Sequence, residues 1–242
     1  MKTLPFLIFL LSFSSAETAD VFFVAPNHLQ TANGNSDGWP FSFPELEIDS
    51  RRYQQVYDAS QFAIMGPNGG YIKQLLFREG SRGANRFLPS VQIDLGTTPR
   101  IPDGLSPVFS ENIGDVYTTV YASSLSVSTP GGWAVITLSQ PFFFSPTQGN
   151  LLMDIRTFTS SEPDPFMLFP TLDAEDTLAD SISAVMANDV NALSGVVTTH
   201  ALVTGFIVEP IPEPGTWVLL GLGLLGIRHF LRRKSKITNQ SQ

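Results

Sequence analysis

The stretch VQIDL, Val91–Leu95, alternates apolar and polar side chains without interruption. Successive side chains of a β-strand point to opposite faces, so its three apolar side chains are expected to face a core while Gln92 and Asp94 face outward. This alternation is typical of a strand that is packed on one side. The stretch therefore predicts a sheet with one buried face.

Similar stretches recur along the chain and are separated by clusters of Gly, Pro, Asn and Ser. We expect further strands at Tyr71–Arg78, Val116–Tyr121, Trp133–Leu138, Leu151–Thr157 and Val196–Val208. In YIKQLLFR, the first of these, apolar residues fall on both faces, so both faces are expected to be partly covered. Many short strands joined by turns predict an all-β domain, a β-sandwich or jelly-roll-like ectodomain, over residues 17–209.

Evidence for helix is thin in this region. The best helical segment is Leu172–Ala187, where Leu178, Ile182 and Val185 fall near helical spacing. A loop with a strand is equally possible for that segment, because Ser181 and Ser183 interrupt it and Asn188-Asp189 follows it. The stretch Asn27–Pro44 is rich in Asn, Gly, Ser and Pro and is expected to be a loop.

The first 16 residues, MKTLPFLIFLLSFSSA, are typical of a secretory signal peptide. A lysine precedes an apolar stretch, and small residues follow it, which places the expected cleavage between Ala16 and Glu17. The chain of 242 residues contains no cysteine, so an exported domain of this kind depends on an ordinary core rather than on disulfides.

Charge is unevenly distributed along the chain, whose net charge is -8. Glu213 is the only one of the 22 acidic residues that follows Ile211, whereas five of the 14 basic residues do. An acidic exported domain repels polyphosphate, so nucleic acid is not expected as a partner. Basic residues beside an apolar segment are typical of the cytoplasmic side of a membrane.

Motifs of known catalytic sites are missing from the sequence. It contains no HExxH, no GxSxG and no phosphate-binding glycine loop. Of the two histidines before the tail, His200 is expected to be a strand residue, and His28 lies in a loop with no partner that the sequence identifies. We therefore expect no enzyme, assign no catalytic residue, and expect no metal and no cofactor.

Three residue groups have alternative functional interpretations. Glu45, Glu47 and Asp49 share one face of an expected strand, either as an acid–base pair or, as we favour, as the solvated face of an edge strand. The acidic residues Asp173, Glu175, Asp176 and Asp180 offer oxygen ligands for calcium, but a charged surface is the favoured interpretation. Trp39, Trp133 and the run Phe142-Phe143-Phe144 provide either core packing, which we favour, or a platform for sugar rings.

The sequence IPEPGTWVLLGLGLLGIRHFLRRK, from Ile211 to Lys234, combines a motif, an apolar run and a basic cluster. A helix over Thr216–Leu231 would span roughly 24 Å at ~1.5 Å per residue, which is short for a ~30 Å bilayer core. We expect one short transmembrane helix at about 215–231. The prolines fix φ and keep the residues before the helix extended and accessible.

This arrangement resembles the PEP-CTERM sorting signal of exopolysaccharide-producing Gram-negative bacteria. The matching residues are Pro212, Glu213 and Pro214 and, after the apolar run, the basic cluster Arg228, Arg232, Arg233 and Lys234. The basic cluster departs from the family pattern because His229-Phe230-Leu231 divides it. The resemblance implies a sorting signal over 210–242 and recognition by exosortase, a membrane enzyme that is thought to cleave near the motif.

Together these features predict an exported, non-enzymatic protein of the cell surface or extracellular matrix. It is expected to be anchored in the inner membrane before exosortase processes it. The alternatives are a carbohydrate-binding module that acts on the exopolysaccharide, with an aromatic patch around Trp39 or Trp133, or a glycan-active enzyme, which requires two facing carboxylates. The expected partners are the exosortase-like membrane protease and extracellular polysaccharide.

Overall fold

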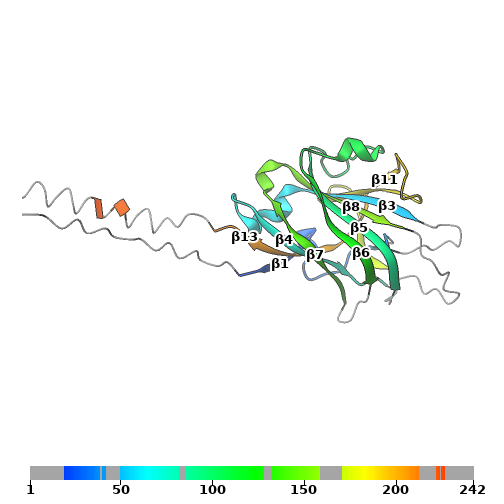
Figure 1. The fold of residues 1–242 in the computed structure, drawn as a ribbon, viewed down its shortest axis with the longest axis horizontal. Helices are drawn as coiled ribbons and strands as arrows, with labels where there is room; N and C mark the ends of the chain where they lie inside the picture. The colour runs from blue at the N-terminus through cyan, green and yellow to red at the C-terminus, as the bar shows by residue number, and fades with distance from the viewer. Residues whose placement is uncertain are drawn as a thin grey trace, which may run out of the picture.

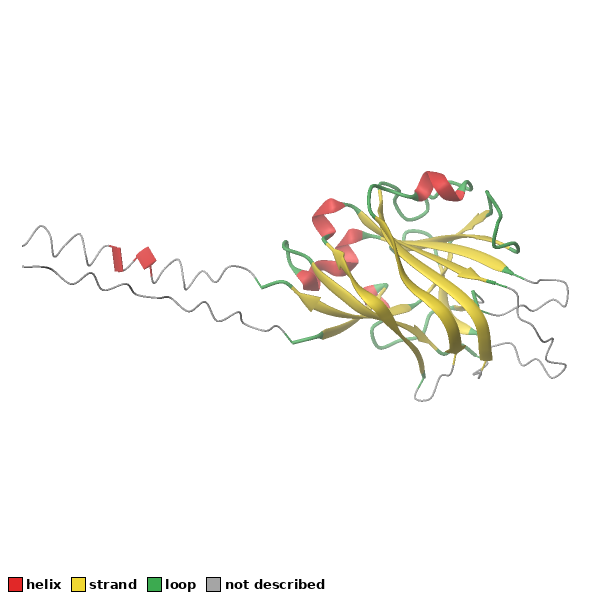
Figure 2. Ribbon diagram, viewed as in Figure 1, coloured by secondary structure: helices red, strands yellow, loops and turns green. Residues whose placement is uncertain are grey.

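The structure is a computed structural model, and it describes residues 19–38, 40–41, 50–81, 86–127, 132–158, 171–212, 222–223 and 225–226. Strands make up most of it, and the helical segments between strands are short 3-10 turns (Figure 2). These turns are η1 (Asn27–Leu29), η2 (Ala59–Met65), η3 (Phe109–Asn112) and η4 (Pro146–Gln148). The predicted all-β class is confirmed.

The strands form three antiparallel sheets. The four-stranded sheet contains, in spatial order, β1 (Val21–Ala25), β13 (Thr204–Pro210), β4 (Gly70–Arg78) and β7 (Trp133–Phe144). The six-stranded sheet contains β11 (Val196–Thr198), β10 (Ile182–Ala187), β3 (Arg51–Tyr57), β8 (Asn150–Thr157), β5 (Arg86–Thr98) and β6 (Tyr117–Val127). A small sheet contains β12 (His200–Leu202), β9 (Leu172–Asp176) and β2 (Ser36–Gly38).

Eight strands of the two larger sheets pair in a nested order. Strand β1 pairs with β13, β3 with β8, β4 with β7, and β5 with β6. The first and third of these pairs build one sheet, and the second and fourth build the other (Figure 1). This connectivity is that of a double-sheet jelly roll, to which β10 and β11 add an edge.

One hydrophobic core lies between the two larger sheets. Val91, Ile93 and Leu95 of β5 are buried in it, as the alternation of VQIDL predicts. Phe77 and Phe206 enter the same core from the four-stranded sheet. Both sheets thus bury one face against the other, which is the packing of a β-sandwich.

Strand β4 departs from simple alternation. A β-bulge interrupts its pairing with β13, because Ile72 and Gln74 face the consecutive residues Val208 and Ile207 and leave one extra residue of β4 between them. Ile72 faces the core before the bulge, and Leu75 and Phe77 face it afterwards, because the extra residue shifts the alternation by one. This shift explains why apolar residues fall on both faces of YIKQLLFR when a period of two is applied.

Two expectations about local structure are wrong. Leu172–Ala187 is not a helix but contains β9 and β10, and Leu178, which contributed to the helical spacing, is 72% exposed in the turn between them. Val196–Val208 is not one strand, because it contributes β11, β12 and part of β13 to three different sheets. The described part of Asn27–Pro44, expected to be a loop, contains η1 and β2.

Candidate functional site

The chain leaves the sandwich at the end of β13, where the expected sorting motif begins. Pro210 pairs with Gly70 of β4. The Ile211 N–H then donates to the Gly69 carbonyl at 2.9 Å, and the Pro212 carbonyl accepts from the Asn68 side-chain amide at 3.3 Å. The first proline of the motif therefore lies against a turn of the domain.

Several predicted residues of the two ends lie outside the described residues. They are Ala16 and Glu17 of the signal cleavage, Glu213 and Pro214 of the motif, and the basic cluster Arg228, Arg232, Arg233 and Lys234. No helix within the described ranges has the length and apolar composition needed to cross a membrane.

The two ends of the sandwich domain lie next to each other. Val21, which opens β1, pairs with Val208 of β13. The Lys73 ammonium bridges the carboxylates of Asp20, at 2.8 Å, and Glu209, at 2.7 Å. Two hydrogen bonds raise the pKa of Lys73 to about 12: the bond to Asp20 has the larger effect and the bond to Glu209 the smaller. This ammonium therefore remains charged and engaged with both carboxylates at neutral pH.

The outer surface of the four-stranded sheet carries an aromatic face, formed by Phe22, Tyr71, Trp133 and Phe143. Phe22, Tyr71 and Phe143 are 40–41% exposed and are the exposed aromatic side chains within the part of the chain that the structure describes. Phe22 meets Trp133 edge to face with ring centroids 5.7 Å apart, and Tyr71 meets Phe143 at 5.6 Å. Exposed aromatic surface concentrated on one face is typical of a contact surface.

Aliphatic and polar residues lie between these two aromatic pairs. Val135 is 52% exposed, and the Gln74 amide donates to the Thr137 hydroxyl at 3.0 Å on the neighbouring strand. Phe143 is level with Tyr71 and Trp133 with Arg78 on β4, so strand rise places these two rings roughly 20 Å apart along the sheet. The aromatic face thus combines apolar rings with hydrogen-bonding groups.

Residues Phe142–Phe144 divide between core and surface. Phe142 and Phe144 are buried in the sandwich, and Phe143 points outward, as alternation along β7 requires. Trp133 is partly buried, and the Arg78 guanidinium lies 4.9 Å from the centre of its ring. Trp39, the other tryptophan considered for sugar stacking, lies outside the described residues, as do Glu45, Glu47 and Asp49.

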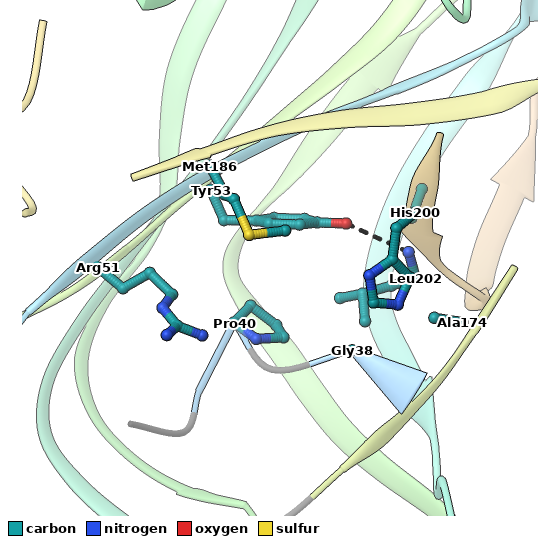
Figure 3. A pocket seen from close by; sticks show the side chains of 9 residues that line it. Gly38, Pro40, Arg51, Tyr53, Ala174, Met186, His200 and Leu202 are labelled. Atoms are coloured by element: carbon teal, nitrogen blue, oxygen red, sulfur yellow. Dashed lines mark hydrogen bonds between the residues drawn. The ribbon is translucent and has the colours of Figure 1, made fainter. Parts of the chain in front are cut away.

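A small cavity lies beside the six-stranded sheet, between Tyr53, Met186 and His200 (Figure 3). Its volume of about 20 Å³ is enough for one water molecule. The Tyr53 hydroxyl accepts a hydrogen bond from the Leu202 N–H at 3.2 Å, and burial raises the pKa of this tyrosine. His200 begins β12, so it is a strand residue as predicted, whereas His28 is exposed in η1.

The four acidic residues considered for calcium do not form one centre. Asp173 accepts the Gly34 N–H at 2.9 Å and pairs with Arg78 at 3.2 Å. Glu175 accepts from the Asn35 side chain at 3.0 Å, and Asp176 accepts from the Thr199 hydroxyl.

Asp173 also borders a pocket of about 290 Å³ with Asp37 and Glu79. Within the described ranges no three His, Asp or Glu side chains are grouped so as to hold a metal ion.

A buried carboxylate pair was missed by the sequence reasoning. Asp94 and Asp154 are register partners on β5 and β8, and neither is exposed. The Tyr117 hydroxyl lies 3.0 Å from Asp94 Oδ2 and 2.9 Å from Asp154 Oδ2. Arg52 pairs with Asp154 at 2.8 Å, and Gln92 donates to Asp94 at 2.8 Å. These donors satisfy both carboxylates inside the fold, and burial raises the pKa of Tyr117.

The comparisons with known proteins bear on the end of the chain. Residues 210–235 match the model of the PEP-CTERM protein-sorting motif. No curated protein matches the chain. The matched range contains the Pro-Glu-Pro residues 212–214 and the basic cluster 228–234 on which the resemblance was based. The chain therefore carries a PEP-CTERM protein-sorting motif, which implies an exported protein that is anchored in a membrane before exosortase processes it.

Proposed function

We propose that the chain is a non-enzymatic protein of the cell surface or extracellular matrix of an exopolysaccharide-producing bacterium, and that its sandwich domain acts by binding. The aromatic face is the observation that carries this proposal. Phe22, Tyr71 and Phe143 are exposed on one face of the four-stranded sheet, and exposed apolar surface gathered on one face favours a contact surface.

Delivery to the surface or matrix is tested by fractionating cells that express the full chain. We expect the processed protein in the matrix or outer-surface fraction, together with a longer precursor in the inner membrane. Processed protein that stays entirely in the periplasm would contradict the proposed destination.

The composition of the aromatic face favours a second, more specific function: binding of extracellular polysaccharide. Sugar rings present C–H groups that pack on aromatic rings and hydroxyls that bond to groups such as Gln74 and Thr137. Among the residues that the structure describes, Lys73 is the one lysine, and it is already paired with two carboxylates, so the face is better suited to an uncharged glycan than to an anionic surface.

A glycan array with the processed protein tests this second function. We expect binding that Tyr71→Ala and Phe143→Ala each reduce at least severalfold. Leu193→Ala is the matched control, because Leu193 is 82% exposed but lies in the loop between β10 and β11. Equal binding by all four proteins would show that the aromatic face is not the glycan site.

A glycan-active enzyme is the less favoured alternative. Asp94 and Asp154 are close enough to be compared with a glycosidase pair, but both are buried and already hydrogen-bonded. A catalytic pair must reach the substrate, which these two carboxylates do not. Release of reducing ends from the exopolysaccharide by the purified protein would contradict the non-enzymatic proposal.

A further inference from the structure

The first three residues of the matched motif lie against one turn of the sandwich domain, and Ile211 and Pro212 are hydrogen-bonded to it. Residues 66–69 join η2 to β4, and we call this turn, together with Gly70 at the start of β4, the docking turn. Pro210 pairs with Gly70, the Ile211 N–H donates to the Gly69 carbonyl, and Asn68 donates to the Pro212 carbonyl. The motif therefore begins on the domain and not on a free linker.

Two glycines allow this close approach. Gly69 has φ of +72°, and a Cβ there would lie 2.3 Å from the Phe144 carbonyl oxygen. A Cβ on Gly70 would lie 2.5 Å from the Glu209 carbonyl oxygen, at the end of β13. The docking turn is thus shaped to receive the residues that lead into the motif.

The docking turn occupies backbone hydrogen-bonding groups of Ile211 and Pro212. Proteins that bind extended segments commonly do so through backbone N–H and C=O groups. Proline has no N–H, so its carbonyl is the only backbone hydrogen-bonding group of Pro212, and Asn68 already holds it. The Ile211 N–H is likewise held by Gly69.

We propose that the docking turn competes with exosortase for Ile211 and Pro212, with Asn68 as the positioning residue that sets how readily this segment is released. The proposal rests on exosortase sorting of the chain. If exosortase binds only chains whose segment has left the docking turn, its apparent affinity for the chain scales with the fraction of chains in that released form. The bond from Asn68 is neutral and exposed, so its loss should raise the released fraction about fivefold, equivalent to ~1 kcal/mol.

Pulse-chase labelling of the full chain in a host with exosortase tests the proposal. We expect Asn68→Ala to lose its precursor faster than the wild type, by up to about fivefold. Hydrogen exchange of the Ile211 amide in the precursor should accelerate by a similar factor. Asn191→Ala, which removes an exposed asparagine side chain between β10 and β11, should change neither rate.

A second control separates release from general loosening of the domain. Val185→Ala weakens a buried cluster on the six-stranded sheet without touching the docking turn, and it should not accelerate sorting. The proposal is overturned if Asn68→Ala is sorted at the wild-type rate or more slowly, or if Val185→Ala is sorted as fast as Asn68→Ala. Failure of sorting itself would look different, because the wild-type precursor would then persist.

Discussion

Asp180 is a buried carboxyl group in the turn between β9 and β10. Its Oδ1 accepts the Ile182 N–H at 3.0 Å, and its Oδ2 is buried with no hydrogen-bond partner among the described residues. Burial raises the pKa of Asp180 to about 6, the Ile182 N–H opposes this shift, and the charges of Asp103 and Glu175 add to it. The folded state thus holds the proton of Asp180 more tightly than the unfolded chain does.

This difference makes stability depend on pH. Because the folded pKa of about 6 lies above the ordinary value of 3.8, the stability that Asp180 contributes is lost as pH rises from about 4 to about 6, and the loss persists at higher pH. Asp180→Asn keeps the bond to Ile182 and removes the charge. We expect it to raise the free energy of unfolding by about 1–2 kcal/mol above pH 6 and to have no effect near pH 4.

Urea unfolding at a series of pH values measures this effect. Asp189→Asn is the matched control, because the exposed Asp189 accepts an N–H two residues ahead in the same way, at 2.9 Å. A stabilisation by Asp180→Asn that does not vary with pH would show that the charge is not its cause.

Asp154 offers a second prediction at the scale of one residue. Its Oδ2 accepts from Arg52 at 2.8 Å and from Gln54 at 2.7 Å, all within the buried outer side of the six-stranded sheet. Asp154→Ala would leave the largely buried Arg52 guanidinium without its carboxylate. We expect a loss of about 3–5 kcal/mol in the free energy of unfolding, measured by urea denaturation. A loss of less than ~1 kcal/mol would contradict this cost of an unpaired buried charge.

At the scale of elements, local alternation predicted β5 well and its surroundings poorly. Val91, Ile93 and Leu95 lie in the core as VQIDL predicts, and Asp94 points to the opposite side. Asp94 is nevertheless unexposed, because Tyr117 and Thr119 of β6 and Asp154 of β8 surround it. A pattern with a period of two shows which side of a sheet a residue occupies, but it does not show what distant segment covers that side.

The apolar patterns of YIKQLLFR and of Leu172–Ala187 were misleading because they too depend on distant segments. The bulge of β4 against β13 reverses the alternation of β4 after Ile72, and nothing in the stretch YIKQLLFR marks the extra residue. Leu178, Ile182 and Val185 gave helical spacing, but Ala179 and Ser181 adopt positive φ in a turn between two strands. Strands β9 and β10 pair with partners far away in the sequence, so tertiary pairing outweighed local propensity there.

The packing of the aromatic face depends on one residue of β13. A Cβ on Gly205 would lie 2.8 Å from Phe22 Cε2 and 3.1 Å from Trp133 Cζ3. We therefore expect Gly205→Ala to separate this edge-to-face pair and to lower the free energy of unfolding by about 1–3 kcal/mol. Val135→Ala, which shortens an exposed side chain on the same face, should cost less than Gly205→Ala. A larger loss of unfolding free energy for Val135→Ala than for Gly205→Ala, measured by urea denaturation, would contradict close packing over Gly205.

At the scale of the whole molecule, the sorting motif was predictable from sequence, whereas the assembly of the aromatic face from Phe22, Tyr71, Trp133 and Phe143 was not. The motif is contiguous, so Pro212 and the residues that follow could be recognised without a structure, and the match to residues 210–235 covers them. The aromatic face draws Phe22 from β1, Tyr71 from β4, and Trp133 and Phe143 from β7. Jelly-roll pairing brings these strands into one sheet, and no local pattern reports that pairing.

The last prediction concerns the residues of the matched motif. Glu213→Ala removes the only acid within residues 210–235, and deletion of 232–234 removes most of the basic charge that is expected to hold the cytoplasmic side. We expect each change to leave unprocessed precursor in the inner-membrane fraction of an immunoblot. Glu209→Ala, the nearest acid outside the match, breaks only an exposed bridge to Lys73 and should be processed normally. Normal release of both motif variants would mean that these residues do not direct sorting.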